Sequence, residues 1–337
     1  MSREEYKINP HINPENPDTN LDRSLRPDLW EEYIGQKTVK DNLQILLQAA
    51  TQRNQQPEHL LFYGPPGLGK TTLAYLIAKE LKAQVKVTSG PAIDKVGDLA
   101  SILTNLNKGD ILFVDEVHRL NKMVEEVLYP AMESGSLHIV LGKGAGARVM
   151  QLDLPPFTLV AATTRIALLS SPLRSRFSGG VFKLNYYTQE EIVKIIDRSA
   201  GLLNIQIERD AAAVIAQRSR YTPRIANHLL KRCRDFAQVN KRPLDRQLAE
   251  ETLTLLGIDS AGLTHADRQV LSVLIDKFNG RPTGLNTLAT ALGEEEATIL
   301  EVYEPYLIQL GFLERTKQGR LATEKGYTHL GISMPTS

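Results

Sequence analysis

Residues 64–72 carry the residue types that bind phosphate. They read GPPGLGKTT and fit the pattern G-x-x-x-x-G-K-[ST]. Glycines let backbone N–H groups curve around phosphate oxygens without Cβ clashes, and the helix that follows adds partial positive charge at its N-terminus. In this pattern Lys70 reaches the β- and γ-phosphates, and the Thr71 hydroxyl holds Mg²⁺. A chance glycine-rich turn is the alternative, but strand and helix patterns flank this loop. The sequence therefore predicts binding and hydrolysis of ATP.

A second motif, ILFVDE, ends about 45 residues after the lysine. An apolar strand of this kind delivers its last residues to the carboxyl edge of a parallel sheet, where such sheets bind ligands. Asp115 is placed to bind Mg²⁺ through water, and Glu116 to polarise the attacking water. Many strands end in acids, so the motif is weak alone, but it is strong at this distance from the phosphate loop.

The transition state of phosphoryl transfer also gains from an arginine near the γ-phosphate, by roughly 10³–10⁵ in rate. Arg174 and Arg176 lie in SPLRSRF, just after the apolar run FTLVAATT, and Arg224 opens a helical pattern in TPRIAN. The ordinary role of each arginine is a solvated or salt-bridging surface residue. Spacing alone does not choose among them.

The elements that must position these residues follow an α/β pattern from 21 to 187. Apolar strands alternate with amphipathic helices there, which predicts a parallel sheet with helices on both faces. Two β-runs around a glycine-rich turn at 137–157 predict a hairpin inserted between two core strands. Only helical patterns remain from 188 to 257, so we expect a small all-helical lid domain. Three helical patterns and a short hairpin in 258–337 predict a winged helix.

Composition sets the remaining bounds. The 337 residues suggest two or three domains at about 150 residues each. Residues 1–20 are polar, rich in Pro and Asn, and lack the apolar core of a secretory signal, which predicts a disordered tail. No run of about 18 apolar residues predicts a membrane span. The single cysteine, Cys233, has no partner for a disulfide or a metal site, so we expect a passive thiol in a cytoplasmic protein.

The net charge is +1, from 40 basic and 39 acidic residues. This balance does not by itself indicate nucleic-acid binding. If DNA is a partner, the positive charge must be local or must come from repeated subunits.

Taken in order, the motifs resemble those of the AAA+ ATPases. Longer strings are similar to one family among them, RuvB, the bacterial motors of Holliday-junction branch migration. The strings are LRPDLWEEYIGQ, TSGPAIDKVGDLASILTNL, VEEVLYPAME, LDLPPFTLVAATTR and EPYLIQLGFLERT. The resemblance covers roughly residues 21–335 and implies a P-loop AAA+ core, a helical lid and a C-terminal winged-helix domain.

The resemblance also implies roles for matching residues. Thr164 looks like the sensor that orients the lytic water with Glu116. Arg176 looks like a finger acting on ATP held by the neighbouring subunit, and Arg224 like a second sensor that reports the γ-phosphate to the lid. The other implied nucleotide contacts are Leu25 and Arg26 toward the base, Gly67, Lys70, Thr71 and Thr72 at the phosphates and Mg²⁺, Tyr187 at the hinge, and Glu133, Ser134 and Gly135 toward the adjacent nucleotide.

The same resemblance implies partners. The hairpin at 137–157 corresponds to the docking element for RuvA, the junction-binding protein; a cover for the sheet edge is the plainer interpretation. RuvC is implied in the resolving complex. A homohexameric ring is expected to pull duplex DNA during recombination and repair. Arg315 and Arg320, on or beside the wing, fit phosphate contacts that carry no sequence preference.

Three features depart from the family pattern. Glu296 stands where the family commonly has a basic DNA contact, and Tyr221 where it usually has glycine. The stretch FSGGVFKL is one residue longer than usual. Other classes remain as alternatives: a clamp-loader subunit, an origin-type initiator, a protein-remodelling chaperone, or a nucleotide-dependent scaffold in which Glu116 is idle.

Overall fold

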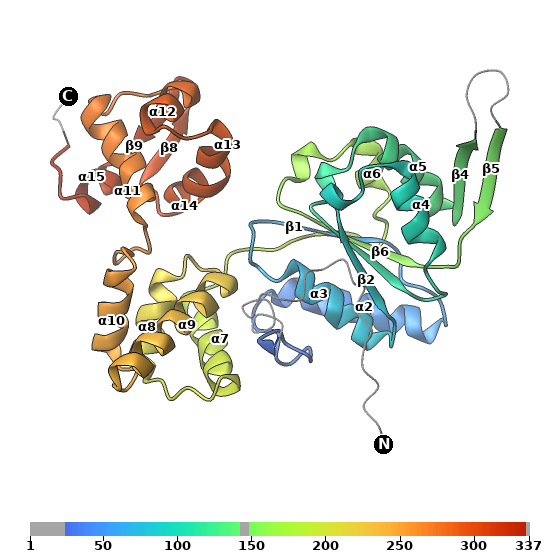
Figure 1. Cartoon of the computed structure of the whole chain (residues 1–337), viewed down its shortest axis with the longest axis horizontal. Coiled ribbons are helices and arrows are strands. Elements are labelled where there is room, and N and C mark those ends of the chain that lie inside the picture. Colours follow the sequence, from blue (N-terminus) through green and yellow to red (C-terminus); the bar gives the residue numbers. More distant parts are fainter. Residues whose placement is uncertain (1–23, 142–147, 335–337) are drawn as a thin grey trace. The chain divides into compact units, whose positions relative to one another are not determined.

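The computed structural model describes residues 24–141 and 148–334. The expected tail at 1–20 and the turn of the inserted hairpin, 142–147, lie outside the described residues. The described chain forms two compact units, which divide between Glu191 and Ile192 (Figure 1).

The first unit is built on a sheet of five parallel strands in the order β2-β3-β6-β1-β7. The three central strands are apolar and buried, as the sequence predicts for strands covered on both faces. The edge strands β2 and β7 are only half-buried and lack a strong apolar run, so the sequence pattern did not reveal them. The strands are β1 (Leu60–Tyr63), β2 (Val85–Ser89), β3 (Ile111–Asp115), β6 (Thr158–Thr163) and β7 (Gly180–Lys183).

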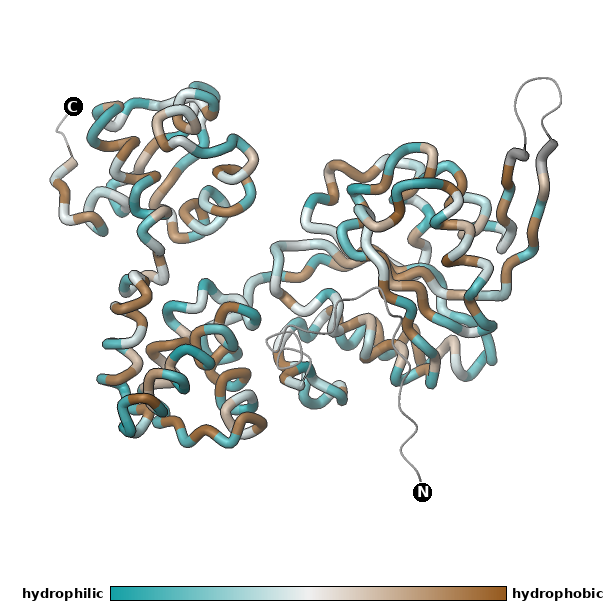
Figure 2. The backbone as a smooth tube through the Cα atoms, in the orientation of Figure 1, coloured by the Kyte–Doolittle hydropathy of each residue, from teal (hydrophilic) through white to brown (hydrophobic). Residues whose placement is uncertain are grey.

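Helices cover both faces of this sheet (Figure 1). Side chains alternate across each strand, so Leu61, Leu112 and Leu159 pack in one core cluster with α4 and α5, while their neighbours face the opposite side. Apolar segments accordingly gather along the strands in Figure 2. The helices are α2 (Lys37–Gln52), α3 (Lys70–Glu80), α4 (Val96–Thr104), α5 (Lys122–Glu133) and α6 (Ser171–Ser175), with short 3₁₀ turns at Gly90–Ala92, Val117–Arg119 and Ile166–Leu168.

Two further strands, β4 (Ser136–Leu141) and β5 (Arg148–Asp153), form an antiparallel hairpin between β3 and β6 in the chain. They make their own two-stranded sheet and project from the first unit (Figure 1). The sequence predicts a hairpin at 137–157, and the described strands begin one residue earlier, at Ser136, and end at Asp153.

The stretch FSGGVFKL contains two adjacent glycines, Gly179 and Gly180, at the start of β7. A Cβ on Gly179 would lie 2.8 Å from the Glu58 carbonyl oxygen, and Gly180 has a φ of +134°. Both positions therefore require glycine, and β7 pairs with β1 from Gly180 onward.

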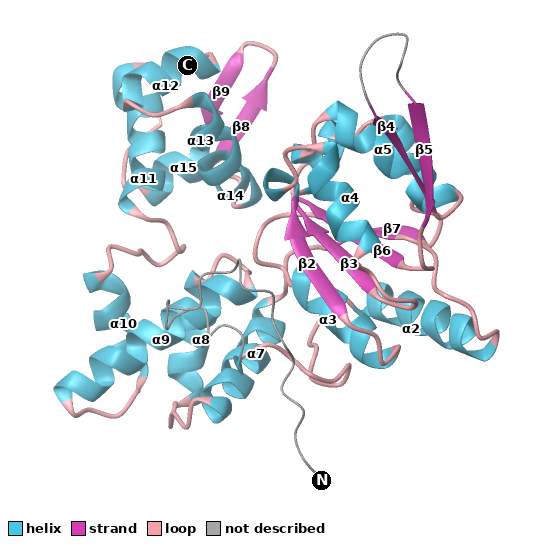
Figure 3. Cartoon of the chain, turned by 45° about the vertical axis from the view of Figure 1, so that its right-hand side comes forward, coloured by secondary structure: helices cyan, strands magenta, loops and turns pink. Residues whose placement is uncertain are grey.

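Four helices follow β7, as predicted for the lid, and the division between the two units falls within the first turn of the first of them. They are α7 (Gln189–Leu202), α8 (Arg209–Arg218), α9 (Pro223–Asn240) and α10 (Arg246–Leu255). The winged helix follows, with a buried core of its own (Figure 3). Its elements are α11 (His265–Ser272), a π-helical turn at Val273–Lys277, α12 (Leu285–Leu292), α13 (Glu296–Thr298), a π-helical turn at Ile299–Tyr303, α14 (Glu304–Gln309), β8 (Leu313–Thr316), β9 (Gly319–Ala322) and α15 (Glu324–His329). In the part of the winged helix that the structure describes, the sequence pattern did not predict the short α15 after the wing.

Candidate functional site

The phosphate loop connects β1 to α3 at the carboxyl edge of the sheet. Gly64 has a φ of +140°, and a Cβ there would lie 2.5 Å from the Leu184 carbonyl oxygen. Lys70 is 7% exposed, and its ammonium donates to the carbonyl oxygens of Gly64 (2.7 Å) and Pro65 (2.8 Å). The backbone of the phosphate loop therefore holds the Lys70 side chain in a defined position.

Strand order brings the other predicted groups to this edge. β6 lies between β1 and β3, and the Gly64 N–H donates to the Thr163 carbonyl oxygen at 3.2 Å. Thr164 donates to Glu116 Oε2 through its hydroxyl (3.0 Å) and through its backbone N–H (3.3 Å). The expected pair of acid and sensor is thus in direct contact, from residues 48 positions apart.

His118 is a residue of this edge to which the sequence analysis gave no role. Its Nδ1 lies 3.1 Å from Glu116 Oε2 and 2.9 Å from the Thr163 hydroxyl, and its side chain is 9% exposed. Glu116 has left-handed backbone (φ 46°, ψ 48°), which begins the short turn that carries His118 back toward it. The only sequence signal was the position of a histidine two residues after Glu116.

Thr71 and Asp115 fit a magnesium ion by their chemistry. Thr71 lies in the first turn of α3 and Asp115 ends β3, and hydroxyl and carboxylate oxygens are the ligands that a hard cation takes. Mg²⁺ commonly uses one or two protein ligands beside phosphate and water oxygens. The described residues contain no group of three or more His, Cys, Asp or Glu that could hold a metal ion.

The residues expected near the base and the hinge lie in the first unit, where they contact the phosphate loop and α3. Tyr187 is buried, and its hydroxyl donates to the Leu68 carbonyl oxygen at 3.1 Å. Burial is the main cause that raises the pKa of Tyr187 to about 12, so it stays neutral. Leu25 is buried, and the Arg26 guanidinium lies over the Tyr75 ring of α3 at 5.2 Å. Gly67 and Thr72 belong to the loop and to the first turn of α3.

Tyr33 is a second tyrosine at this position that the sequence analysis did not single out. It is buried, its hydroxyl lies 3.4 Å from that of Tyr187, and burial raises its pKa well above the ordinary value. A Cβ on Gly69 would lie 2.9 Å from the Tyr33 hydroxyl. The third glycine of the motif is therefore needed for side-chain packing as well as for its φ of +96°.

Arg176 and the three residues assigned to the adjacent nucleotide lie together. Arg176 Nη2 pairs with Glu133 Oε1 at 2.9 Å, while Ser134 and Gly135 follow directly at the end of α5. Arg176 is half-buried, whereas Arg174 is exposed. The structure thus distinguishes the two candidate arginines by their surroundings.

Arg224 lies exposed in the first turn of α9, in the second unit, so a contact with the phosphates remains a prediction. Tyr221 adopts left-handed backbone (φ 54°), and so does Arg220 (φ 55°). The conformation that glycine would favour is therefore kept with a tyrosine. The Arg220 guanidinium holds this bend through Asp267, which is fully buried, and through the face of Tyr306.

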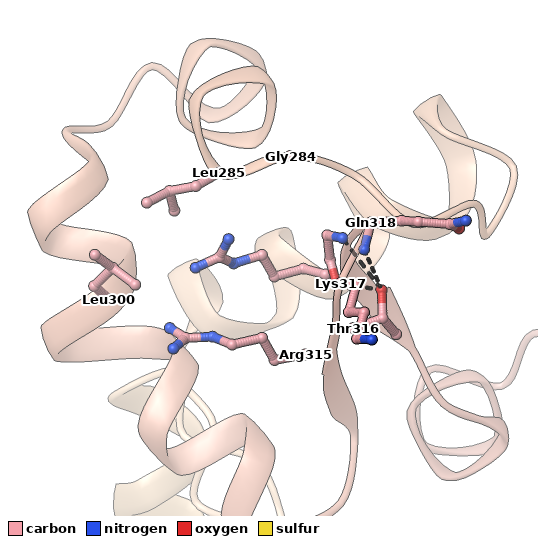
Figure 4. Close-up of a pocket in the computed structure, with 9 residues that line it drawn as sticks. Gly284, Leu285, Leu300, Arg315, Thr316, Lys317 and Gln318 are labelled. Carbon is pink, nitrogen blue, oxygen red and sulfur yellow. Dashed lines mark hydrogen bonds between the residues drawn. The ribbon is translucent and has the colours of Figure 1, made fainter.

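The wing carries a pocket of about 450 Å³ between β8, β9 and the start of α12 (Figure 4). Arg315 and Arg320 both line it, and both pair with buried Glu304: Arg315 Nε at 2.7 Å and Arg320 Nη2 at 3.2 Å. The Arg315 side chain is 54% exposed and that of Arg320 is 12% exposed. Arg315 is therefore open to a ligand, while Arg320 is largely an internal partner of Glu304.

Glu296, the acid at a position where the family commonly has a basic residue, contacts α12. It accepts a hydrogen bond from Asn286 Nδ2 at 3.0 Å. Cys233 is fully buried in α9, and burial raises the pKa of its thiol to about 12. Among the described residues, no helix is both long and apolar enough to cross a membrane.

Comparison with known families covers nearly the whole described chain. Residues 25–183 match the model of the Holliday junction DNA helicase RuvB P-loop domain, residues 187–259 the RuvB AAA lid domain, and residues 260–331 the RuvB C-terminal winged helix domain. Among solved structures, the chain is similar to the Thermotoga maritima RuvB Holliday junction branch migration motor. The identity is 50%, the match covers 93% of this chain and 100% of that chain, and the TM-score is 0.84. A point variant of that protein gives 50% identity, coverage of 92% and 100%, and a TM-score of 0.85.

Proposed function

Because the chain belongs to the RuvB family of P-loop ATPases, we propose that it is an ATP-driven motor that moves duplex DNA at Holliday junctions during recombination and repair. The observation that carries the proposal is the direct contact of Glu116 with Thr164 beside the phosphate loop, in a chain that also bears a winged helix. We place the boundaries of its domains after residues 20, 187 and 257, and its site of action in the cytoplasm.

Lys70 and the loop bind the phosphates. Phosphate oxygens replace the carbonyl oxygens of Gly64 and Pro65 as acceptors for the Lys70 ammonium, and the first turn of α3 adds its N-terminal charge. Thr71 and Asp115 would hold Mg²⁺, which when bound supplies charge neutralisation at the phosphates. Gly67 and Thr72 complete the cradle.

Glu116 orients the attacking water, and its own orientation is fixed by neighbours. Thr164 donates two hydrogen bonds to one carboxylate oxygen, and His118 lies within hydrogen-bond distance of the same oxygen. The other carboxylate oxygen remains for water. A positioned acid or base of this kind contributes about 10²–10⁴ in rate.

A neighbouring copy of the chain completes the site. Arg176 acts as the finger on the nucleotide of the adjacent subunit, with Glu133, Ser134 and Gly135 beside it at that interface. The assembly we propose is a homohexameric ring. On the base side, Leu25, Arg26 and Tyr187 contact the nucleotide, and Arg224 reports the γ-phosphate state to the lid.

The winged helix grips DNA through phosphates. Arg315 is the exposed member of the pair, and Arg320 stabilises the wing beside it while lining the same pocket. Contacts of this kind set position without reading bases, which suits a motor that must travel along any sequence. The hairpin β4–β5 docks RuvA, and RuvC joins the resolving complex.

The test is ATP-driven dissociation of a synthetic four-way junction, with and without RuvA. We expect dissociation that requires ATP and RuvA and that is lost in Glu116→Gln. Active ATP hydrolysis without junction dissociation in the presence of RuvA would reject the motor and favour another DNA-processing ATPase of clamp-loader or initiator type.

A further inference from the structure

The Arg176 guanidinium rests on the ring of Tyr129. Its Cζ lies 4.4 Å from the ring centroid, within the range of a cation–π contact. Both amino groups are also held: Nη1 donates to the Pro172 carbonyl oxygen at 2.6 Å, and Nη2 pairs with Glu133 at 2.9 Å. The side chain is only 21% exposed. A long arginine that would otherwise sample many rotamers is thus kept in one place.

The ring itself is fixed from two helices. The Tyr129 hydroxyl donates to Glu125 Oε2 at 3.1 Å and lies 3.1 Å from the Ser170 hydroxyl. Glu125 is buried one turn earlier in α5. Ser170 caps α6 by accepting from the Leu173 N–H. Burial, the largest cause, raises the pKa of Tyr129, so the hydroxyl stays protonated and can donate.

We propose that Tyr129 is the positioning residue of the arginine finger: Glu125 and Ser170 fix its ring, and the ring aims Arg176 at the neighbouring nucleotide. The inference rests on the proposed role of Arg176 and adds the device that orients it. A guanidinium already held in its working direction loses less freedom when it meets the transition state. Tyr129 itself touches no nucleotide, so its effect is on rate in the adjacent site.

A plainer role is possible for the same contacts, since Tyr129 also ties α5 to α6. A residue needed only for that packing would lower stability when removed, and any loss of activity would stay in the subunit that carries the change. A positioning residue lowers kcat of the neighbour's site and leaves nucleotide affinity alone. The two roles therefore differ in which subunit is affected.

The first measurement compares Tyr129→Leu with Tyr129→Phe in the full-length chain. For Tyr129→Leu we expect kcat for ATP hydrolysis to fall about tenfold, as the loss of a partly desolvated cation–π contact suggests, with KM changed less than about twofold. Tyr129→Phe keeps the aromatic ring, so its kcat should fall less than that of Tyr129→Leu. Met123→Leu, on the exposed side of α5, is the control and should match the wild type. A tenfold rise in KM with unchanged kcat would overturn the inference.

The second measurement mixes subunits. Glu116→Gln subunits bind ATP without hydrolysing it but keep an intact finger, so adding them should raise hydrolysis per Tyr129→Leu subunit. The same mixture with Arg176→Ala tests the finger itself. Rescue of Arg176→Ala but not of Tyr129→Leu would overturn the positioning role and leave the finger standing. No rescue of either would remove the finger assignment and this inference with it.

Discussion

At the scale of single residues, Glu116 shows how much support a catalytic acid receives. The Thr164 hydroxyl and the Thr164 N–H both donate to one of its oxygens, and His118 Nδ1 lies 3.1 Å from the same oxygen. Its left-handed backbone costs of order 1–3 kcal/mol for a residue other than glycine. Strain of this kind persists where neighbouring contacts over-determine a geometry, and here they orient a carboxylate at the strand edge.

Replacing Thr164 with valine tests this support. The change keeps shape and removes the hydroxyl donor to Glu116, so we expect kcat for ATP hydrolysis to fall by about 100-fold. The KM for ATP should change little, because the loop and Lys70 are untouched. Steady-state hydrolysis assays check this, with Thr104→Val, an exposed helical threonine, as the matched control. Unchanged kcat would reject Thr164 as the sensor.

At the scale of elements, the two strands of the wing are bound to α14 by one carboxylate, that of Glu304. Glu304 opens α14 and is buried, yet it pairs with one arginine from β8 and one from β9. The two strands are thereby fastened to the helical part of the winged helix. The hydrogen bond with Glu304 raises the pKa of Arg315, which therefore stays cationic at any pH where the protein is folded.

Removing Glu304 should loosen the wing. Glu304→Ala leaves Arg320, whose side chain is 12% exposed, without its partner, and breaking a buried pair of this kind costs about 3–5 kcal/mol. We expect a corresponding loss in the free energy of unfolding, measured by chemical denaturation. Glu314→Ala, an exposed acid in the same strand as Arg315, is the control and should change it by less than about 0.5 kcal/mol. Equal values for the two variants would show that the pair adds no stability.

Removing Arg315 should instead affect DNA. Arg315→Ala is expected to weaken binding of duplexes of any sequence and to reduce the slope of log affinity against log salt by about one per subunit. Fluorescence anisotropy across a salt series measures both quantities. Lys325→Ala, an exposed cation on α15, controls for the loss of one charge. A sequence-dependent loss would contradict a contact with phosphate.

At the scale of the whole molecule, the proposed site is divided between subunits. The groups that bind phosphate and orient water lie at one sheet edge, while Arg176 is held against Glu133 of its own chain. The net charge of +1 gives a single chain little long-range attraction for DNA. Both features suit a ring in which each copy contributes one finger and a few phosphate contacts.

Hydrolysis should therefore depend on assembly. Arg176→Ala is expected to bind ATP normally and to lose at least about 10³-fold in kcat. In the wild type, the rate per subunit should rise with protein concentration as subunits associate. Nucleotide titration and a dilution series of the ATPase assay check the two parts. A concentration-independent rate with Arg176→Ala fully active would place the whole reaction in one subunit.

The sequence by itself determined the phosphate loop, the acids after β3 and the succession of α/β core, helical lid and winged helix. These are local properties: a glycine spacing, an apolar run, a helical period. It left β2, β7 and α15 unseen, because short and half-exposed elements have weak patterns and depend on neighbours for stability. Only the tertiary structure decided which distant residues meet. Strand order brings Thr164 to Glu116, helix packing places Tyr129 under Arg176, and burial makes Glu304 the partner of both wing arginines. Such contacts join residues far apart in the chain, and no spacing within the sequence records them.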